Sequence, residues 1–208
     1  MPTGRKIAEC IHLVALGLWL GSLVMTALVA AQVFPTMSRL GPVLPDYGTD
    51  PADHWRIVAG HVGAFTFFSN DVIQFLCVLL AVVSLIASVW LYRLSLRRIS
   101  TAVRSMLLGA AVMMVAYQLM LLGPEMNAEL RAYWRAAQAG DASTAAAHRD
   151  TFAALHPRAT TALSATMLAV LGCMVAGVWS ITSDPAMQAS SRPGEAKLEP
   201  PALGTGPL

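Results

Sequence analysis

Two long apolar runs separated by a polar stretch constrain this chain more than any other feature. The runs are residues 106–123 and 159–181, and each has roughly the ~20 residues that an α-helix needs to cross a bilayer. The polar stretch between them keeps a helical pattern on both sides of Gly140 and Asp141. Because glycine and aspartate favour turns, residues 101–182 are predicted to form one long helical hairpin with its tip at Gly140.

Two further apolar runs, 7–34 and 72–92, bring the number of candidate spans to four. Of the 208 residues, 56% are hydrophobic and 12% are charged, whereas soluble domains carry about 25% charged residues. We therefore predict an all-α integral membrane four-helix bundle with spans at about 7–34, 72–92, 104–123 and 159–181. The helical domain comprises residues 1–182, and the Pro/Ser/Gly-rich segment 183–208 is predicted to be a disordered cytoplasmic tail.

The first run has a second interpretation, since Val29-Ala30-Ala31 could be a signal-peptide cleavage site. The run exceeds 20 residues, whereas the apolar region of a signal peptide has about 7–15. An uncleaved first span is therefore the favoured interpretation. Within it, Gly17 and Gly21 stand four residues apart, a spacing that lets another helix approach closely.

Positive charge indicates the orientation of the spans. The connection between the second and third spans is short and holds Arg93, Arg97, Arg98 and Arg104. Lysine and arginine accumulate in short cytoplasmic connections, so both termini are predicted to be cytoplasmic, in a protein typical of the bacterial inner membrane.

The two outer segments complete the predicted fold. Segment 35–53 contains four prolines and is predicted to be a loop, because proline interrupts helices. Residues 53–71 and 124–155 carry helical apolar stripes and are predicted to extend the bundle beyond the outer side of the membrane. Residues 53–92 could form one helix or break near Ser69 to Asp71, and one continuous helix is favoured. Asp141 is a predicted N-cap.

Three ionisable residues reach one layer at the outer membrane edge when residues are counted from the cytoplasmic ends of the spans. They are Asp71, Glu125 and His156. Such a layer could hold copper or another divalent ion, or relay protons. The alternative, which is favoured, is structural: Asp71 caps a helix, Glu125 faces water and His156 pairs with a carboxylate. His12, alone in the first span, is expected to hydrogen-bond a neighbouring helix.

Other site chemistries find no support in the sequence. The cysteines Cys10, Cys77 and Cys173 are far apart, which indicates neither a disulfide scaffold nor a zinc site. No phosphate-binding glycine loop, Ser/His/Asp set or HExxH motif is present. The net charge of +2 is too small to indicate nucleic acid. We expect no enzymatic activity, and the sequence names no cofactor; the expected partners are membrane lipid, other membrane subunits or further copies of the chain.

Two groups of motifs resemble a known family. His12-Leu13-Val14 through Trp19-Leu20-Gly21 is followed by Gly123-Pro124-Glu125-Met126-Asn127 and by Phe152-Ala153-Ala154-Leu155-His156. This order resembles the transmembrane protein 205-like family of small four-span membrane proteins. The resemblance covers roughly residues 7–179 and implies the fold and a membrane location, but no enzymatic activity. The chain departs from the family pattern in its longer first loop, 41–53, and at Pro157 and Arg158. The positions that match are His12, Trp19, Gly21, Pro124, Asn127, Phe152 and His156.

Three functional hypotheses follow. The first is an interaction or assembly protein that docks partners on an exposed aromatic stripe containing Tyr133 and Trp134. The second is binding or transport of a metal ion or small solute through Asp71, Glu125 and His156. The third is an accessory subunit of a larger membrane complex.

Overall fold

The computed structural model describes residues 3–91 and 99–182, so the predicted tail 183–208 lies outside the described residues. In order, the elements are α1 (Thr3–Leu40), the short 3-10 helix η1 (Pro51–Asp53), α2 (His54–Trp90), α3 (Ile99–Tyr117), the π-helix η2 (Gln118–Leu122), α4 (Gly123–Gln138) and α5 (Ala142–Thr182). Four helical stretches are long and apolar enough to cross a membrane. The predicted all-α membrane bundle is confirmed.

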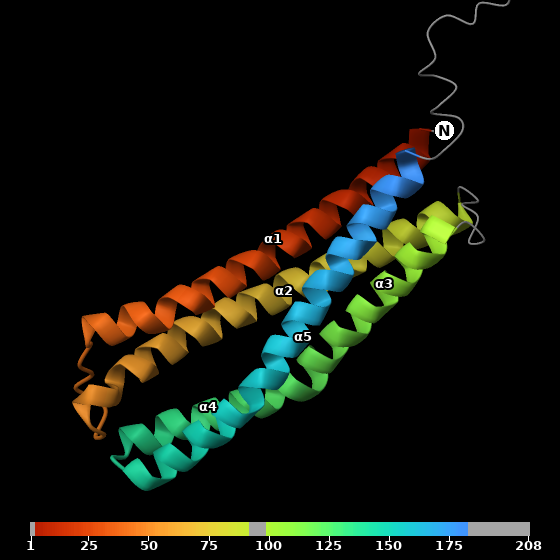
Figure 1. Cartoon of the computed structure of the whole chain (residues 1–208). Coiled ribbons are helices and arrows are strands. Elements are labelled where there is room, and N and C mark those ends of the chain that lie inside the picture. Colours follow the sequence, from red (N-terminus) through yellow and green to blue (C-terminus); the bar gives the residue numbers. More distant parts are fainter. Residues whose placement is uncertain (1–2, 92–98, 183–208) are drawn as a thin grey trace, which may run out of the picture.

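The helices are arranged as two antiparallel pairs (Figure 1). The first pair is α1 and α2, which lie side by side along most of their length. The second pair is formed by α5 with α3, which continues through η2 into α4. At the end opposite the N-terminus, α4 and the first part of α5 form the predicted hairpin, with its tip at Gly140 and Asp141.

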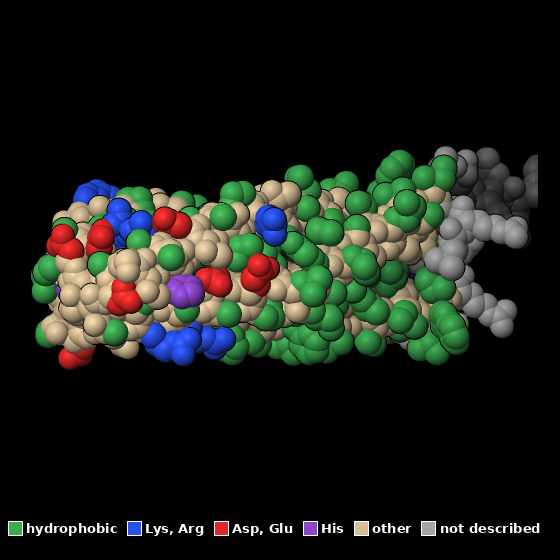
Figure 2. Space-filling model, turned by 90° about the horizontal axis from the view of Figure 1, so that it is seen from below, with side chains coloured by type: hydrophobic (Ala, Val, Ile, Leu, Met, Phe, Trp, Pro, Cys, Tyr) green, Lys and Arg blue, Asp and Glu red, His purple; other side chains and the backbone are tan. Residues whose placement is uncertain are grey.

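The helices are about twice as long as a bilayer requires. At about 1.5 Å per residue, a helix of 38 residues such as α1 is roughly 57 Å long, against ~30 Å of hydrocarbon. The remainder forms the extension at the hairpin end. Figure 2 shows charged side chains gathered toward that end, while green hydrophobic side chains dominate the rest of the visible face. This division is expected if only the apolar part is immersed in lipid.

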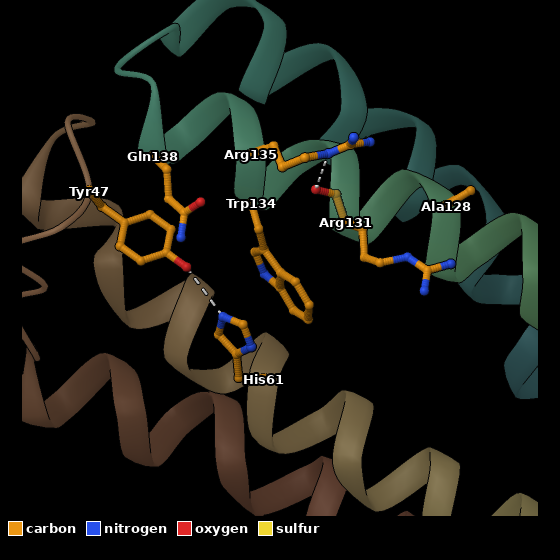
Figure 3. A pocket seen from close by; sticks show the side chains of 7 residues that line it. All are labelled: Tyr47, His61, Ala128, Arg131, Trp134, Arg135 and Gln138. Atoms are coloured by element: carbon orange, nitrogen blue, oxygen red, sulfur yellow. Dashed lines mark hydrogen bonds between the residues drawn. The ribbon is translucent and has the colours of Figure 1, made fainter.

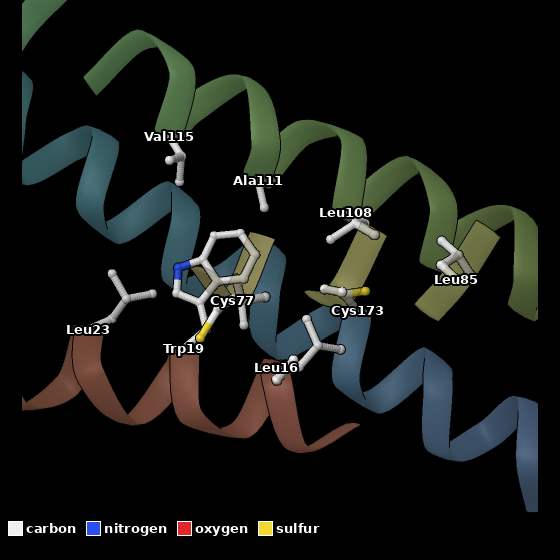
Figure 4. Close-up of a cluster of buried hydrophobic side chains, with 12 residues drawn as sticks. Leu16, Trp19, Leu23, Cys77, Leu85, Leu108, Ala111, Val115 and Cys173 are labelled. Atoms are coloured by element: carbon white, nitrogen blue, oxygen red, sulfur yellow. The ribbon is translucent and has the colours of Figure 1, made fainter. Parts of the chain in front are cut away.

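Each part of the bundle has its own core. In the spans, buried side chains from all four long helices meet at the centre (Figure 4); among them are Leu16, Trp19 and Leu23 of α1, Cys77 of α2, Leu108, Ala111 and Val115 of α3, and Val170 and Cys173 of α5. A second cluster in the extension consists of Ile57, Leu130, Tyr133, Ala137 and Ala145. The extension is therefore a packed unit of helices.

The hairpin tip is fixed by backbone geometry. Gly140 adopts φ +73°, a conformation that side chains with a Cβ disfavour. The Asp141 carboxylate accepts a hydrogen bond from the Thr144 N–H at 3.0 Å, which confirms the predicted N-cap. Gly48 packs against this tip, and a Cβ on Gly48 would lie 2.9 Å from the Gly140 Cα atom. Segment 41–50 thus covers the end of the hairpin.

Two predictions about α1 are corrected. The loop predicted from residue 35 begins only after Leu40, because α1 continues through Pro35 and ends at Leu40, directly before Gly41 with φ +55°. A proline inside a helix removes one backbone hydrogen bond, and here the helix continues beside α2 despite that loss. In addition, nothing lies within 4 Å of a Cβ placed on Gly17 or Gly21. The two glycines therefore face away from the other helices of this chain.

The long α2 agrees with the favoured prediction, since it is continuous from His54 to Trp90. An unpredicted feature is the π-helix between α3 and α4, where the Gly123 N–H donates to the Gln118 carbonyl. Pro124 follows directly and lacks an N–H. The wider turn of the π-helix therefore lies directly before the proline, at the outer end of the predicted third span.

Candidate functional site

A buried ionic cluster lies between α1, α2 and α3 near the N-terminal end of the bundle. We call it the first polar cluster and define it as Glu9, His12, Ser84 and Arg104. Arg104 Nη1 donates to Glu9 Oε2 at 2.7 Å, and Arg104 Nε donates to His12 Nε2 at 3.1 Å. Arg104 and His12 are 0% exposed and Glu9 is 4% exposed. Buried ions in a membrane bundle are costly and usually functional.

The hydrogen bonds assign the protonation of His12. Its Nε2 accepts from the Arg104 guanidinium, so the ring proton lies on Nδ1. From there it is shared between the Ala81 carbonyl at 2.9 Å and the Ser84 hydroxyl at 3.1 Å. A neutral histidine therefore connects the ion pair to α2, as the predicted bond to a neighbouring helix required.

Local sequence explains why these groups meet. Glu9 and His12 are three residues apart and share one face of α1. α5 contributes close packing, because a Cβ on Gly177 would approach Leu13 Cδ2 at 3.3 Å and Arg104 Nε at 3.8 Å. Cys173 of α5 donates from its thiol to the Arg104 carbonyl at 3.5 Å. Groups of α1 and α5 therefore surround the guanidinium of α3, and α2 is joined to them through His12.

A second polar cluster, consisting of Trp19, Asp71, Gln74 and Gln118, lies farther along the bundle. Trp19 Nε1 donates to Gln74 Oε1 at 3.1 Å. Asp71 Oδ1 accepts from Gln118 Nε2 at 2.9 Å and from Gln74 Nε2 at 3.4 Å. Gln118 is the first residue of the π-helix, so the helical irregularity lies at a polar contact between α2 and α3.

An apolar belt separates the two clusters along the axis. Leu16, Ala111 and Val170 are 0% exposed and belong to the central core. Figure 4 shows side chains from α1, α2, α3 and α5 pointing toward one another in this region. The bundle interior is thus polar, apolar and polar again from one end to the other.

The structure does not bring Asp71, Glu125 and His156 together as metal ligands. Asp71 is half-buried and bonds glutamines, whereas Glu125 and His156 are exposed. The His156 ring lies 6.3 Å from the Phe152 ring, centroid to centroid. In the described residues, no group of three or more His, Cys, Asp or Glu is placed to hold a metal. Counting along helices predicts depth but not rotation about each helix axis, and rotation separates these side chains.

Of the positions that match the family resemblance, some contact the interior of the molecule and the others lie on its surface. His12 and Trp19 are buried and each contacts a polar group of α2. Phe152 packs against the extension core. The remaining positions are on the surface; they are Gly21, Pro124, Asn127 and His156.

An open crevice lies between α2 and α4 in the extension (Figure 3). Its volume is about 460 Å³, and it is lined by Tyr47, His61, Ala128, Arg131, Trp134, Arg135 and Gln138. The indole of Trp134 stacks on the His61 imidazole with ring centroids 3.8 Å apart. The Tyr47 hydroxyl lies 3.3 Å from His61 Nε2. Burial lowers the pKa of His61, which favours the neutral ring.

The predicted exposed aromatic stripe is wrong for Tyr133. This side chain is 8% exposed and belongs to the extension core, because helices α4 and α5 and residues of segment 41–50 pack around it. Trp134 is half-buried and lines the crevice. The candidate docking surface on α4 is therefore a crevice lined by Arg131, Arg135 and Trp134, and not an exposed aromatic stripe.

Sequence reasoning missed the partners of His12. Charge pattern groups Arg104 with the cytoplasmic arginines and does not single out Glu9, although Glu9 and His12 form a Glu-x-x-His spacing inside an apolar run. An acid and a histidine on one helix face, with an arginine at the start of another span, were the available signal. Gln74 and Gln118 were missed for the same reason, since isolated polar residues in spans pair across helices.

Fold and interior together define a four-span integral membrane protein with a folded extension at one end. No protein-family model, curated protein or solved structure matches the chain.

Proposed function

We propose that this chain is a non-enzymatic interaction or assembly protein of a membrane complex, and that an acidic segment of a partner subunit docks in the crevice of the extension. One observation carries the proposal. Arg131 and Arg135 line the crevice, and neither forms an ion pair with a carboxylate in the described part of the chain.

Charge and shape favour an acidic partner. Arg131 and Arg135 are four residues apart on α4, where like charges repel slightly unless an anion lies between them. Figure 3 shows both side chains extending from α4 in the direction of Ala128, on the same side of the Trp134 ring. Arginine and tryptophan are the residues most enriched at the centres of protein interfaces.

The experiment is photocrosslinking in the native membrane. A photoreactive residue at Gln138 in the crevice is expected to capture a discrete partner, and Arg131→Gln/Arg135→Gln is expected to reduce that product at least about tenfold, since charge-assisted hydrogen bonds to both arginines are lost. Arg39→Gln/Arg158→Gln is the control, because it removes the same charge from exposed arginines outside the crevice. Equal capture by both double variants would count against the proposal, as would a clean monomer after extraction in mild detergent.

Orientation and relatedness belong to the same proposal. Arg93, Arg97 and Arg98, in the short connection between the second and third spans, support a cytoplasmic location of both termini and an extension on the outer side of a bacterial inner membrane. The order of the motifs around His12, Pro124 and Phe152 supports membership of the transmembrane protein 205-like family. The partners that this proposal implies are other membrane subunits or a second copy of the chain.

A second candidate function is the handling of protons or a small solute in the bundle interior. The buried pair of Glu9 and Arg104 supports it, whereas Asp71, Glu125 and His156 do not form the metal layer on which this hypothesis first rested. Proton uptake into liposomes containing the purified protein tests it. Glu9→Gln is expected to abolish uptake, and uptake equal to that of the wild type would exclude this role.

A further inference from the structure

Four buried polar atoms near the N-terminal end of the bundle have no hydrogen-bond partner among residues 3–91 and 99–182, the part of the chain that the structure describes. They are Glu9 Oε1, Arg104 Nη2, Thr101 Oγ1 and Ser88 Oγ. Arg104, Thr101 and Ser88 are 0% exposed, and Glu9 is 4% exposed. Polar atoms buried without a partner are rare in native proteins, and an internal water is the usual explanation.

The four atoms belong to one level of the bundle. Glu9 and Arg104 are in direct contact, and Thr101 precedes Arg104 by one helical turn on α3. Ser88 follows Ser84 by four residues on α2, and Ser84 contacts His12, which is one turn from Glu9. Three helices therefore direct unpaired polar atoms to the same region, beside the ion pair.

We propose that this region is a hydration site, in which water molecules bridge Glu9, Arg104, Thr101 and Ser88. Arg104 Nη2 can only donate and Glu9 Oε1, in the carboxylate, can only accept, while the two hydroxyls do both. A bare cation would be repelled by the guanidinium, and a bare anion by the carboxylate. A neutral molecule that both donates and accepts satisfies every group, and water is the smallest one.

The route for water is short at one end and closed at the other. Ser88 is two residues from the end of α2, Thr101 is two residues from the start of α3, and Glu9 is six residues, or about 9 Å, from the start of α1. Toward the extension, the apolar belt of Leu16, Ala111 and Val170 follows. The site is thus a hydrated end of the bundle that stops at the belt. This inference goes beyond both proposed functions, because it requires neither a partner nor transport.

Radiolytic footprinting of the full-length protein in detergent micelles tests the proposal, since hydroxyl radicals form from water beside the side chain that they oxidise. The chain supplies a matched pair of buried cysteines. Both belong to the central core, where Cys173 is 0% and Cys77 is 4% exposed, but Cys173 also contacts the first polar cluster, with its Sγ 3.9 Å from His12 Nε2. Oxidation of Cys173 at least about fivefold faster than that of Cys77 is expected, because oxidation follows access to water. Equal or slower oxidation of Cys173 overturns the proposal.

A second measurement uses the sign of a stability change. Thr101→Val keeps the shape of the side chain and removes its hydroxyl. If the hydroxyl binds water, the variant is expected to unfold at lower denaturant, whereas a dry and unpaired hydroxyl would make the valine variant more stable. Thr166→Val is the control, because the Thr166 hydroxyl is buried and donates to the Ala162 carbonyl at 2.8 Å. A Thr101→Val variant more stable than the wild type overturns the proposal even where the footprint is ambiguous.

Discussion

At the scale of single residues, Arg104 organises the interior of the bundle. Its guanidinium bonds Glu9 and His12 of α1, and its carbonyl accepts from Cys173 of α5. Through His12 the same network reaches the Ala81 carbonyl of α2. One side chain on α3 therefore connects the two helical pairs where hydrophobic attraction between helices is weak, because lipid is as apolar as the helix surfaces.

Removal of one partner of this buried pair should be far more costly than removal of both. Arg104→Met leaves the Glu9 carboxylate buried without its cation and is expected to lower the free energy of unfolding by about 3–5 kcal/mol. Glu9→Gln/Arg104→Met is expected to recover much of that loss, because no buried charge remains. Denaturant titration in mixed micelles measures each value.

The control for this cycle is the exposed pair of Arg149 and Asp150, whose side chains are 40% and 70% exposed. Arg149→Met is expected to change the free energy of unfolding by no more than about 1 kcal/mol, as exposed ion pairs do. Equal losses in the free energy of unfolding for Arg104→Met and Arg149→Met would show that breaking the buried pair costs no more than breaking an exposed one.

Asp141 gives the hairpin tip a defined response to acid. Hydrogen bonds from Thr144 and Ser143 lower the pKa of its carboxyl from 3.8 to about 2. Because the folded pKa is depressed, the cap stabilises the tip above pH 3.8 and loses this effect as the pH falls toward 2. Between pH 5 and pH 2.5, Asp141→Asn should therefore lose less thermal stability than the wild type. An identical acid response in both proteins would contradict the role of this cap.

At the scale of elements, the π-helix η2 is the point at which α3 leaves the span and becomes α4. Its backbone hydrogen bond from the Gly123 N–H to the Gln118 carbonyl directly precedes Pro124. The Gln118 side chain donates a hydrogen bond to the Asp71 carboxylate. The irregularity thus combines a tolerated proline with a polar contact between helices.

Two glycine substitutions on this continuous helix should have opposite signs. A Cβ on Gly123 would lie 2.8 Å from the Gln118 carbonyl oxygen, whereas a Cβ on Gly109 meets nothing within 4 Å. Gly123→Ala is expected to destabilise by about 1–3 kcal/mol, because backbone must shift. Gly109→Ala is expected to stabilise by about 0.4–1 kcal/mol, because alanine restricts the unfolded chain. Thermal unfolding in one detergent compares them, and stabilisation by both would mean that the π-helix relaxes freely.

Elements were easier to predict from the sequence than contacts. Apolar period and length predicted the continuous α2 and the hairpin at Gly140, since these signals are local. Pro35 predicts the end of a helix, yet α1 lies beside α2 and continues to Leu40. The pairing of Glu9 with Arg104 joins residues 95 positions apart, and it depends on the rotation of two helices about their axes. Depth counting cannot supply that rotation, which is also why Asp71, Glu125 and His156 were grouped wrongly.

At the scale of the whole molecule, the two ends of the bundle differ in chemistry. The N-terminal end holds the first polar cluster close to the helix ends, and the other end carries the folded extension with its basic crevice. The lipid-facing surface between them is apolar, with Leu18, Leu28 and Val83 among its exposed side chains. A molecule of this kind presents different groups to the two sides of a membrane.

The orientation of this asymmetric molecule is the last prediction. Four spans place the N-terminus and residue 182 on one side and Gly140 on the other. Arg93, Arg97 and Arg98 should hold their end in the cytoplasm. Alkaline phosphatase, which is active only outside the cytoplasm, is expected to be active when fused after Gly140 and inactive when fused after Thr182. A fluorescent protein that matures only in the cytoplasm is the reciprocal reporter and should give the opposite pattern. Phosphatase activity at both sites would mean that α5, which alone separates the two fusion points, does not cross the membrane. Inactivity at Gly140 would place the crevice on the cytoplasmic side.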